Sequence, residues 1–421
     1  MELHYNKYSF SYKFGVIMKE VDVFIIGAGP AGSIAGAKLV QEGYSVKIVD
    51  KQSFPRFVIG ESLLPRCNEL LENAKMLQSV EDAGFMVKKG AVFTNNSGAQ
   101  VDLDFSKNLG QKWGSSFQVK REEFDKILID DAQTKGCDVE YEVGVIAYDE
   151  IENIITTEDK EGNQTKYKAR KVLDGSGYGR VLPRLLGLEA DSSLANRRAT
   201  FARVKGDIRP EGETNGYIFI SVVGDNDAWI WNIPFSDGTT SVGIVCTEEY
   251  FESFGMSDEE FWDHIIEITD YTKERYKDAT RTVEVGSLSG YSVAVTKLFD
   301  KNYILTGNAS EFLDPVFSSG VTLALESGAK AAELVARELR GESIDYKVEY
   351  EEYMMIGINV FRDYVNTWYD GTLQTILFSE KKNEEVTKKI ISILSGYVWD
   401  ENNSFVTSSK YALEKTYEML K

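Results

Sequence analysis

The hydrophobic positions near the start of the chain form a continuous run that is followed at once by glycines. Residues 21–26 are apolar and rich in β-branched side chains, which fits a strand buried on both faces of a parallel sheet. Residues 33–42 then have the pattern of a helix, and residues 45–49 form a second apolar strand. This order predicts the first unit of a doubly wound α/β domain.

Similar patterns return far along the chain. Helical periodicity over 119–133 and 321–339, with short apolar strands at 171–173 and 302–306, predicts segments that rejoin the same sheet. From about residue 346 the pattern is helical to the end. Segments in which apolar and polar residues alternate more regularly predict antiparallel strands of a second domain. They are residues 90–105, 198–205, 217–223, 228–234 and 240–245.

The turn Gly27-Ala28-Gly29-Pro30-Ala31-Gly32 has the spacing of a dinucleotide-binding loop. Gly27 permits a tight turn, Gly29 lets the backbone approach a pyrophosphate, and Gly32 lets helix and strand pack closely. The helix that follows offers unpaired N–H groups and a positive dipole end. Asp50 lies 21 residues after Gly29, where a carboxylate can bind a ribose hydroxyl. The sequence therefore predicts a site for FAD or NAD and disfavours NADP.

Composition narrows the remaining classes. With 421 residues the chain can form two or three domains, and its net charge of −20 disfavours nucleic acid or an anionic membrane as partner. The two histidines, His4 and His264, argue against a His-based triad or a metal site. The three cysteines are far apart, and we expect a reducing, cytoplasmic location.

No apolar run approaches the ~18 residues of a membrane span, and residues 1–20 lack the apolar core of a signal peptide. We expect residues 1–20 to be an extension before the first strand.

Two later strings carry further chemistry. Trp229 and Trp231 lie two positions apart in a predicted strand and so share a face, as sheet core or as the wall of a site. Residues 312–320 read Phe-x-x-Pro-x-x-Ser-x-Gly before a predicted helix, whose N-terminus would suit an anion. Ser318 and Ser319 could equally serve only as caps of that helix.

With these motifs in order, the chain resembles the flavoprotein monooxygenase superfamily over roughly residues 21–342. Within it, Trp229-x-Trp231-x-Ile233-Pro234 is similar to the WxWxIP motif of the flavin-dependent halogenases, and residues 312–320 to their FxxPxxSxG motif. Phe317 stands where the branch acting on free tryptophan has a glutamate. The resemblance is therefore to the branch with phenolic or carrier-bound substrates.

The resemblance implies an α/β fold with three parts. These are a glutathione-reductase-like Rossmann FAD domain, an inserted antiparallel β substrate domain and a helical C-terminal region. We expect the FAD domain at 21–84, 117–187 and 282–342, the substrate domain at 85–116 and 188–281, and the C-terminal region at 343–421.

The resemblance also implies the residues that contact FAD. Asn308 replaces the family aspartate that holds the ribityl chain, and Arg121 is the family arginine near the cofactor unless it is only a surface helix residue. Glu61 is either a catalytic group or the capping acid of a helix over 62–73. The predicted cofactor residues are Gly27, Gly29, Pro30, Ala31, Gly32, Asp50, Lys51, Arg56, Arg121, Asp174, Gly175, Asn308, Pro315, Gly320 and Val321.

In such enzymes chloride or bromide is oxidised to hypohalous acid, here near Ser319 and Gly320, which passes Trp229 and Trp231 toward a lysine. Lys88 and Lys89 are the candidates for this lysine, and we favour Lys89 by its position before the strand at residue 90. An amine in a dry tunnel has a lowered pKa and stays nucleophilic. The alternative is that both lysines are solvated at a turn.

Asp314 matches a residue that in some relatives becomes covalently linked to the flavin, although we do not expect such a link here.

The sequence thus predicts an FAD-dependent oxidoreductase that uses O2 and halide to modify a small phenol-like or pyrrole-like ring, free or bound to a carrier protein. Electrons would come from a flavin reductase or from transient NAD(P)H, since no second dinucleotide-binding loop is present. The alternatives are a prenyl (geranylgeranyl-type) reductase, an aromatic-ring hydroxylase and a flavin-binding protein without turnover.

Overall fold

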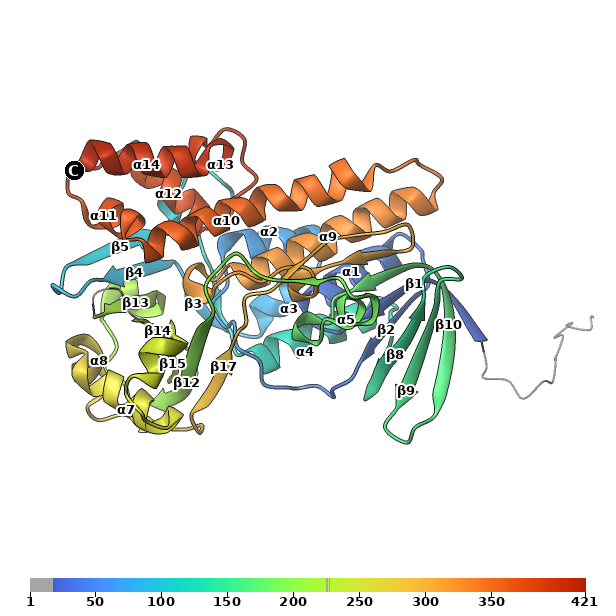
Figure 1. Ribbon diagram of the computed structural model, residues 1–421, viewed down its shortest axis with the longest axis horizontal. Helices are drawn as coiled ribbons and strands as arrows, with labels where there is room; N and C mark the ends of the chain where they lie inside the picture. The colour runs from blue at the N-terminus through green and yellow to red at the C-terminus, as the bar shows by residue number, and fades with distance from the viewer. Residues whose placement is uncertain (1–17, 225, 227) are drawn as a thin grey trace, which may run out of the picture.

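The structure is a computed structural model that describes residues 18–224, 226 and 228–421. Two large sheets lie toward opposite ends of the molecule, and two long helices, α9 (Ser319–Leu339) and α10 (Tyr353–Tyr369), run along one side between them (Figure 1). Each sheet collects strands from segments far apart in the sequence. The fold is mixed α/β, as the hydrophobic patterns predict.

The first sheet has a parallel core. Strand β1 is parallel to its neighbours β2 and β10, and β19 is parallel to β10, which confirms the predicted return of distant segments to one sheet. Strands β8, β9 and β10 form an antiparallel meander that the sequence patterns did not predict. Across the sheet the strands are β7 (Asp138–Tyr141), β2 (Val46–Asp50), β1 (Met18–Ile26), β10 (Gln164–Asp174), β9 (Ile154–Asp159) and β8 (Val143–Asp149), with β19 (Tyr303–Leu305) also beside β10.

We expected residues 1–20 to precede the first strand, but residues 18–20 already belong to β1. Residues 1–17 lie outside the described part of the chain.

The second sheet is mostly antiparallel but contains one parallel pair, β13 with β4. These two strands lie more than a hundred residues apart in the chain. No hairpin turn joins them, so nothing requires them to be antiparallel. Strand β17 extends this sheet beyond residue 281, where we expected it to end. Across the sheet the strands are β16 (Thr280–Arg281), β12 (Arg197–Lys205), β15 (Thr239–Thr247), β14 (Ala228–Pro234), β13 (Ile218–Val223), β4 (Gly90–Thr94) and β5 (Gln100–Asp104), with β17 (Gly286–Ser289) beside β12.

Two short pairs complete the strands: β3 (Met86–Lys88) with β6 (Ser116–Gln118), and β11 (Glu189–Ala190) with β18 (Ala294–Val295).

Helices α1 (Pro30–Gln41) and α9 pack closely in the first domain. A Cβ on Gly328 would lie 2.3 Å from the carbonyl oxygen of Ala31, so this glycine allows the two backbones to approach. The other helices of this part are α2 (Pro65–Asn73), α3 (Leu77–Asp82), α4 (Arg121–Thr134) and α5 (Val181–Leu186). Helices α6 (Glu248–Glu252), α7 (Asp258–Ile268) and α8 (Asp270–Tyr276) lie in the chain between strands β15 and β16 of the second sheet.

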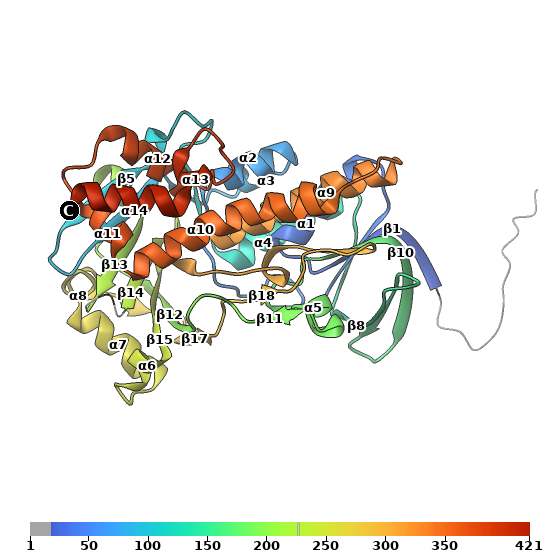
Figure 2. The same ribbon diagram turned by 45° about the horizontal axis from the view of Figure 1, so that its top comes forward.

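The C-terminal region is helical, as predicted. Helices α11, α12 and α14 lie over the β4–β5 end of the second sheet in both views (Figures 1 and 2). No described helix is both long enough and apolar enough to cross a membrane. The helices are α11 (Thr372–Phe378), α12 (Glu384–Leu394), α13 (Ser404–Thr407) and α14 (Ser409–Leu420).

We predict that Gly243→Ala disturbs the second sheet. Gly243 on β15 lies opposite Trp231, and a Cβ there would meet the indole at 2.1 Å. Overpacking of this kind costs about 1–3 kcal/mol of stability. Urea unfolding should show this loss, and near-ultraviolet circular dichroism should report a displaced indole. Gly144→Ala is the control, because the nearest atom to its Cβ is a Lys51 carbon at 4.0 Å; equal midpoints for the two variants would contradict the prediction.

Candidate active site

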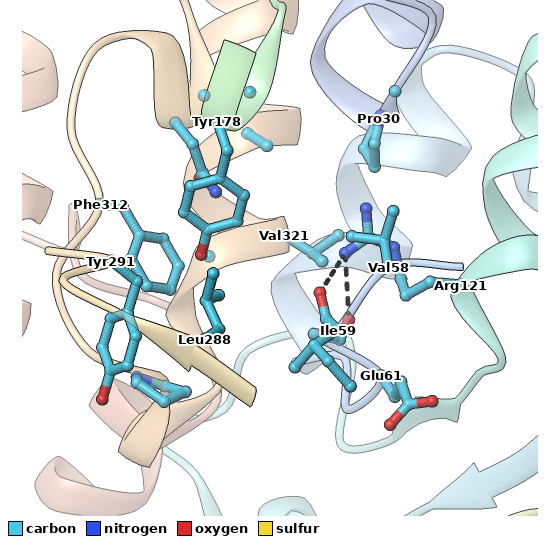
Figure 3. A pocket seen from close by; sticks show the side chains of 18 of the residues that line it. Pro30, Val58, Ile59, Glu61, Arg121, Tyr178, Leu288, Tyr291, Phe312 and Val321 are labelled. Carbon is cyan, nitrogen blue, oxygen red and sulfur yellow. Dashed lines mark hydrogen bonds between the residues drawn. The ribbon is translucent and has the colours of Figure 1, made fainter. Parts of the chain in front are cut away.

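A cavity of about 270 Å³ lies between the first domain and the second sheet. Figure 3 shows Pro30 and Arg121 on one side of it, and Tyr178, Leu288 and Phe312 on the other. The dinucleotide loop and the segment 56–62 line one side, and residues from β12, β13, β14 and β17 line another. The segment 307–324 closes the cavity, so three of the motifs identified in the sequence meet in one place.

The glycine turn has the geometry that its sequence predicts. Gly27 has φ +96°, and a Cβ there would lie 2.4 Å from the carbonyl oxygen of Gly175. A Cβ on Gly32 would lie 2.0 Å from the Gly27 oxygen. The turn therefore touches the 175–179 loop and the helix at once, which only glycine permits. Gly27 and Gly32 shape the cradle without lining the cavity, whereas Gly175 lines it.

The start of α1 presents backbone donors to the cavity. Gly29 is the N-cap residue, and Gly29, Pro30 and Ala31 all line the cavity, where the first N–H groups of the helix lack helical partners. Asp50 also lines it, and its two oxygens accept from the N–H groups of Ala28 and Gln52, each at 2.9 Å. A glycine cradle, a helix N-terminus and a carboxylate fit the pyrophosphate and ribose of a dinucleotide.

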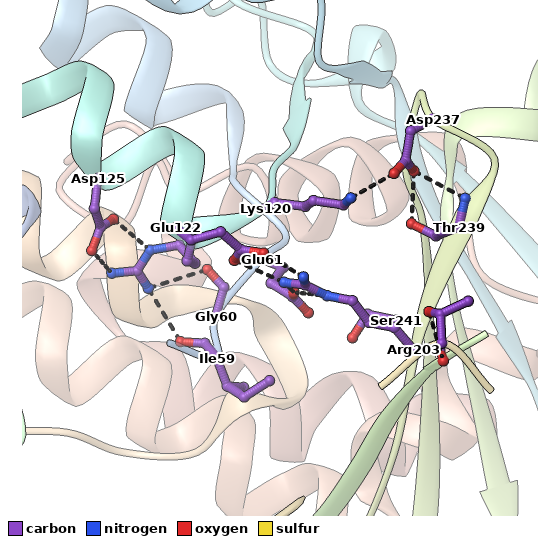
Figure 4. Close-up of polar contacts among 12 residues, drawn as sticks. Ile59, Gly60, Glu61, Lys120, Glu122, Asp125, Arg203, Asp237, Thr239 and Ser241 are labelled. Atoms are coloured by element: carbon purple, nitrogen blue, oxygen red, sulfur yellow. Dashed lines mark hydrogen bonds and ion pairs between the residues drawn. The ribbon is translucent and has the colours of Figure 1, made fainter. Parts of the chain in front are cut away.

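Two arginines lie beside this cradle. Arg56 reaches within 3.4 Å of where a Gly29 Cβ would be, and its Nη1 pairs with Asp125 Oδ2 at 3.2 Å. Arg121 donates to both oxygens of Asp125, at 2.7 and 3.0 Å, and to the carbonyl of Ile59 at 3.2 Å (Figure 4). Burial opposes its charge, but Asp125 more than offsets this and the pKa of Arg121 is raised. Both fixed cations line the cavity.

Besides Gly27 and Gly32, two more of the predicted cofactor residues, Lys51 and Asp174, do not line the cavity. Lys51 is exposed and is not among the residues that line the cavity. Asp174 is fully buried, and its carboxylate accepts from the N–H groups of Ser176 at 2.9 Å and Leu182 at 2.7 Å. Asp174 therefore supports the loop that carries Gly175. Asn308 lines the cavity as predicted.

Both tryptophans of β14 line the cavity, so they form its wall in addition to being sheet core. Their ring centroids are 6.0 Å apart. The Trp229 indole N–H donates to the Tyr369 hydroxyl at 2.8 Å, and the Trp231 indole N–H donates to the Ser241 hydroxyl at 3.1 Å. Each ring is thus fixed at its polar edge.

The segment after Asp314 lies at the N-terminus of α9. Pro315, Ser318, Gly320 and Val321 line the cavity, and Ser318 precedes the helix with φ +57°. Ser319, which we predicted near the halide, is the first residue of the helix and is buried outside the lining, between Ser318 and Gly320, which line it. The open N–H groups at this end of a 21-residue helix suit an anion.

The structure distinguishes the two candidate lysines. Lys88 is 1% exposed, and its Nζ donates to the carbonyl of Leu63 at 2.9 Å. Burial lowers the pKa of Lys88 to about 7. Lys89 is exposed, so the expectation that it is the enclosed amine is not met. Successive residues of an extended chain face opposite sides, and only one of the two could point inward.

Lys88 lines a second cavity of about 10 Å³. Phe105, Phe317 and Leu394 also line this cavity. Ile218 and Ser318 line both cavities, so they form the wall between Lys88 and the larger cavity.

Sequence reasoning missed a buried ion cluster beside the site. Arg203 on β12 donates to Glu61 Oε1 at 2.6 Å and to Glu122 Oε2 at 2.9 Å (Figure 4). Burial raises the pKa of Glu61 although Arg203 opposes this. Glu61 does not cap α2, because the N-cap residue of that helix is Leu64. A glutamate and an arginine 142 residues apart gave no local signal of this contact.

Asp314 is also fixed by contacts from outside its own motif. Its Oδ2 accepts from the Tyr369 hydroxyl at 3.0 Å and its Oδ1 from the Val316 N–H at 3.0 Å. Burial raises the pKa of Asp314 to about 6, against the positive charge of Arg197. Tyr369 was missed because a single tyrosine in a helical region forms no recognisable motif.

Among the described residues, no group of histidine, cysteine, aspartate and glutamate side chains could hold a metal ion.

We predict that Asp314→Asn removes a pH dependence of stability. The carboxyl is neutral more easily in the folded chain, with a pKa of about 6 against the ordinary 3.8. Its contribution to stability is therefore lost as pH rises through about 6, by roughly 1 kcal/mol between about pH 5 and about pH 7.5. Urea unfolding at both pH values should show the parent losing this much relative to the variant. A difference between the two proteins that does not change with pH would contradict the prediction.

Comparisons with known proteins agree with this geometry. The family model described as tryptophan halogenase matches residues 22–115 and 99–413. A 1H-pyrrole-2-carbonyl-[peptidyl-carrier protein] brominase of Pseudoalteromonas luteoviolacea is 30% identical over 402 residues, which cover 91% of this chain and 93% of that protein. The corresponding chlorinase of Pseudomonas fluorescens is 26% identical over 407 residues, 90% of each chain.

Solved structures show the same fold. A flavoprotein/dehydrogenase from Cytophaga hutchinsonii has a TM-score of 0.92 and 42% identity, covering 96% of this chain and 99% of that one. The flavin-dependent brominase Bmp2 has a TM-score of 0.84 at 24% identity, covering 96% of this chain and all of that one (100%). From the family match over nearly the whole chain, together with these relatives, it follows that the chain belongs to the tryptophan halogenase family of flavin-dependent enzymes.

Proposed function

We propose that this protein uses reduced FAD, O2 and chloride or bromide to halogenate an electron-rich aromatic ring. The observation that carries this proposal is the wall shared by two cavities. On one side of Ile218 and Ser318 lies the dinucleotide cradle, and on the other lies the buried amine of Lys88. An oxidant made on one side thus has a short path to a nucleophile on the other.

The larger cavity would hold FAD. The N–H groups at the start of α1, with Arg56 and Arg121, would bind the pyrophosphate, and Asp50 would bind the ribose. Asn308, Pro315, Gly320 and Val321 would contact the remainder of the cofactor. When bound and reduced, FAD would give two electrons to O2, and the O2 so reduced to the peroxide level would accept two more from the halide, forming hypohalous acid and water. The protein would bind and orient the reactants and exclude bulk water.

The halide would bind at the N-terminus of α9, near Ser318 and Gly320. Backbone N–H groups there can hold an anion without a cationic side chain. Trp229 and Trp231, fixed by hydrogen bonds at their indole nitrogens, keep the facing wall of the cavity apolar. An apolar wall limits the loss of hypohalous acid to water.

Lys88 would receive the oxidant. Because burial lowers its pKa to about 7, a substantial fraction of its amine is neutral at neutral pH. The Leu63 carbonyl fixes the direction of Nζ without supplying a compensating negative charge. A neutral, oriented amine can attack hypohalous acid or hold it by a hydrogen bond, and then present the halogen to a ring.

The substrate would be a phenol-like or pyrrole-like ring. Phe105 and Phe317 line the cavity of Lys88, and Phe317 packs edge-on against Trp368 with centroids 6.0 Å apart. These rings make the surroundings of Lys88 apolar and aromatic, and a ring would have to widen the cavity of about 10 Å³ to reach the amine. The lining offers no carboxylate to pair with the ammonium group of an amino acid substrate. The two pyrrolyl-carrier relatives support a ring that is either free or attached to a carrier protein.

Electrons would reach FAD from a separate flavin reductase, since the sequence has no second dinucleotide-binding loop. The cysteines Cys67, Cys137 and Cys246 are buried thiols, which supports the reducing cytoplasm as the location.

The test is a bromination assay with variants of the adjacent lysines. Purified protein is supplied with FAD, a flavin reductase, NADH, O2 and bromide, together with a panel of phenols and pyrroles. We expect products with the bromine isotope doublet in mass spectra. Lys88→Ala should lose at least ~99% of this product because the enclosed amine is gone, and Lys89→Ala should keep it within about twofold because its side chain is exposed.

FAD content, measured by absorbance, should be the same in all three proteins. Hydroxylated products without bromine would instead favour a monooxygenase, and NADH consumption with neither product would favour a reductase. A loss of bromination in Lys89→Ala but not in Lys88→Ala would contradict the assignment of the amine.

A further inference from the structure

Tyr369 lies where the two halogenase motifs meet, yet it belongs to neither. It is the last residue of α10, far along the chain from both motifs. Its hydroxyl accepts from the indole N–H of Trp229 at 2.8 Å and donates to Asp314 Oδ2 at 3.0 Å. A phenol can accept and donate at the same time, so a single oxygen atom joins the two.

Both partners of this hydroxyl lead into the site. Trp229 lines the large cavity. Asp314 accepts through its other oxygen from the Val316 N–H, at the start of the loop that leads through Ser318 into α9. The Tyr369 ring is held in turn by the Arg197 guanidinium, which lies 3.3 Å from the ring centroid. The tryptophan wall of the cavity, the loop before α9 and the C-terminal end of α10 are therefore linked by one continuous series of hydrogen bonds.

These contacts use both oxygens of Asp314. Each accepts one hydrogen bond, and the carboxyl is 1% exposed. The arrangement fits an anchor for the loop better than a group that is free to react.

We propose that Tyr369 is a positioning residue that sets the place of the halide-binding loop relative to Trp229. The proposal rests on the proposed function, because the halide site is part of it. It makes the C-terminal helical region a working part of the active site as well as a cover for the second sheet.

The physical reason is the cost of unpaired groups. Without the Tyr369 hydroxyl, a buried indole N–H and a buried carboxylate oxygen would both lack a partner, each at about 1–3 kcal/mol. The loop and the indole would shift to recover partners, and the N–H groups at the start of α9 would no longer be held in place for a halide. Asp314 would also lose a hydrogen bond that lowers its pKa.

Tyr369→Phe tests this proposal, with Tyr364→Phe as the matched control. Tyr364 lies on the same helix and is buried, but its hydroxyl has no hydrogen-bond partner among the described residues. Bromide is titrated into each FAD-loaded protein, and its dissociation constant is read from the change in FAD fluorescence. We expect bromide to bind about tenfold more weakly to Tyr369→Phe, which is one unpaired hydrogen bond expressed as affinity, and unchanged within about twofold to Tyr364→Phe.

Two further measurements separate positioning from a general loss of structure. The affinity for FAD should be the same in the parent and both variants, because Tyr369 does not line the cavity. The midpoint pH of bromide binding, which follows the ionisation of Asp314, should rise in Tyr369→Phe alone. Asp314 then lacks the hydrogen bond from Tyr369 that lowers its pKa, and Arg197 and Tyr291 are the groups that remain around it.

Equal bromide affinity in the parent and Tyr369→Phe, or an equal loss in Tyr364→Phe, would overturn the proposal. The outcome for the proposed function is distinct. A parent that binds bromide but makes no brominated product contradicts the function alone, whereas a parent that brominates while Tyr369→Phe binds bromide normally contradicts only the role of Tyr369.

Discussion

The relative placement of the two sheets depends on one buried cation. Arg203 projects from the second sheet and pairs with Glu61 and Glu122 of the first domain. Removing one partner of such a cluster leaves an uncompensated charge out of water, typically at 3–5 kcal/mol. The charges therefore restrict how the sheet can sit against the first domain, and the cavity, the tryptophan wall and the shared partition all lie along this junction.

A comparison of two buried lysines shows how the chain sets the chemistry of an amine. Lys47 pairs with Asp138 and Glu140, and although burial opposes its charge, these carboxylates raise its pKa. Lys88 lies deeper and bonds only to a backbone carbonyl, so burial prevails and its pKa falls. A carbonyl accepts the hydrogen bond of the amine without neutralising its charge. Lysine is therefore held as a cation in one place and becomes neutral more easily in the other.

The sequence predicts those features that depend on neighbours along the chain. The glycine turn, Asp50 and the indoles at positions 229 and 231 could be identified because their spacing alone implies a turn, a strand end or a shared face. The choice between Lys88 and Lys89 could not, because the following strand Gly90–Thr94 is buried at every position and shows no alternation of apolar and polar residues that would reveal which side faces inward. The parallel pairing of β13 with β4 and the contact of Tyr369 with Asp314 depend on segments that meet only in the folded chain.

The wall of Ile218 and Ser318 between the two cavities affects when the oxidant and the substrate can reach Lys88. The space around Lys88 is about 10 Å³, enough for roughly one water-sized molecule, so an aromatic ring cannot pass from the cofactor side through Ile218 and Ser318 without moving them. Under the proposed function, oxidant and substrate would then arrive from different directions. Reduction of the flavin and arrival of the ring would be independent events, and the enzyme would hold its oxidising equivalent on Lys88 until a substrate comes.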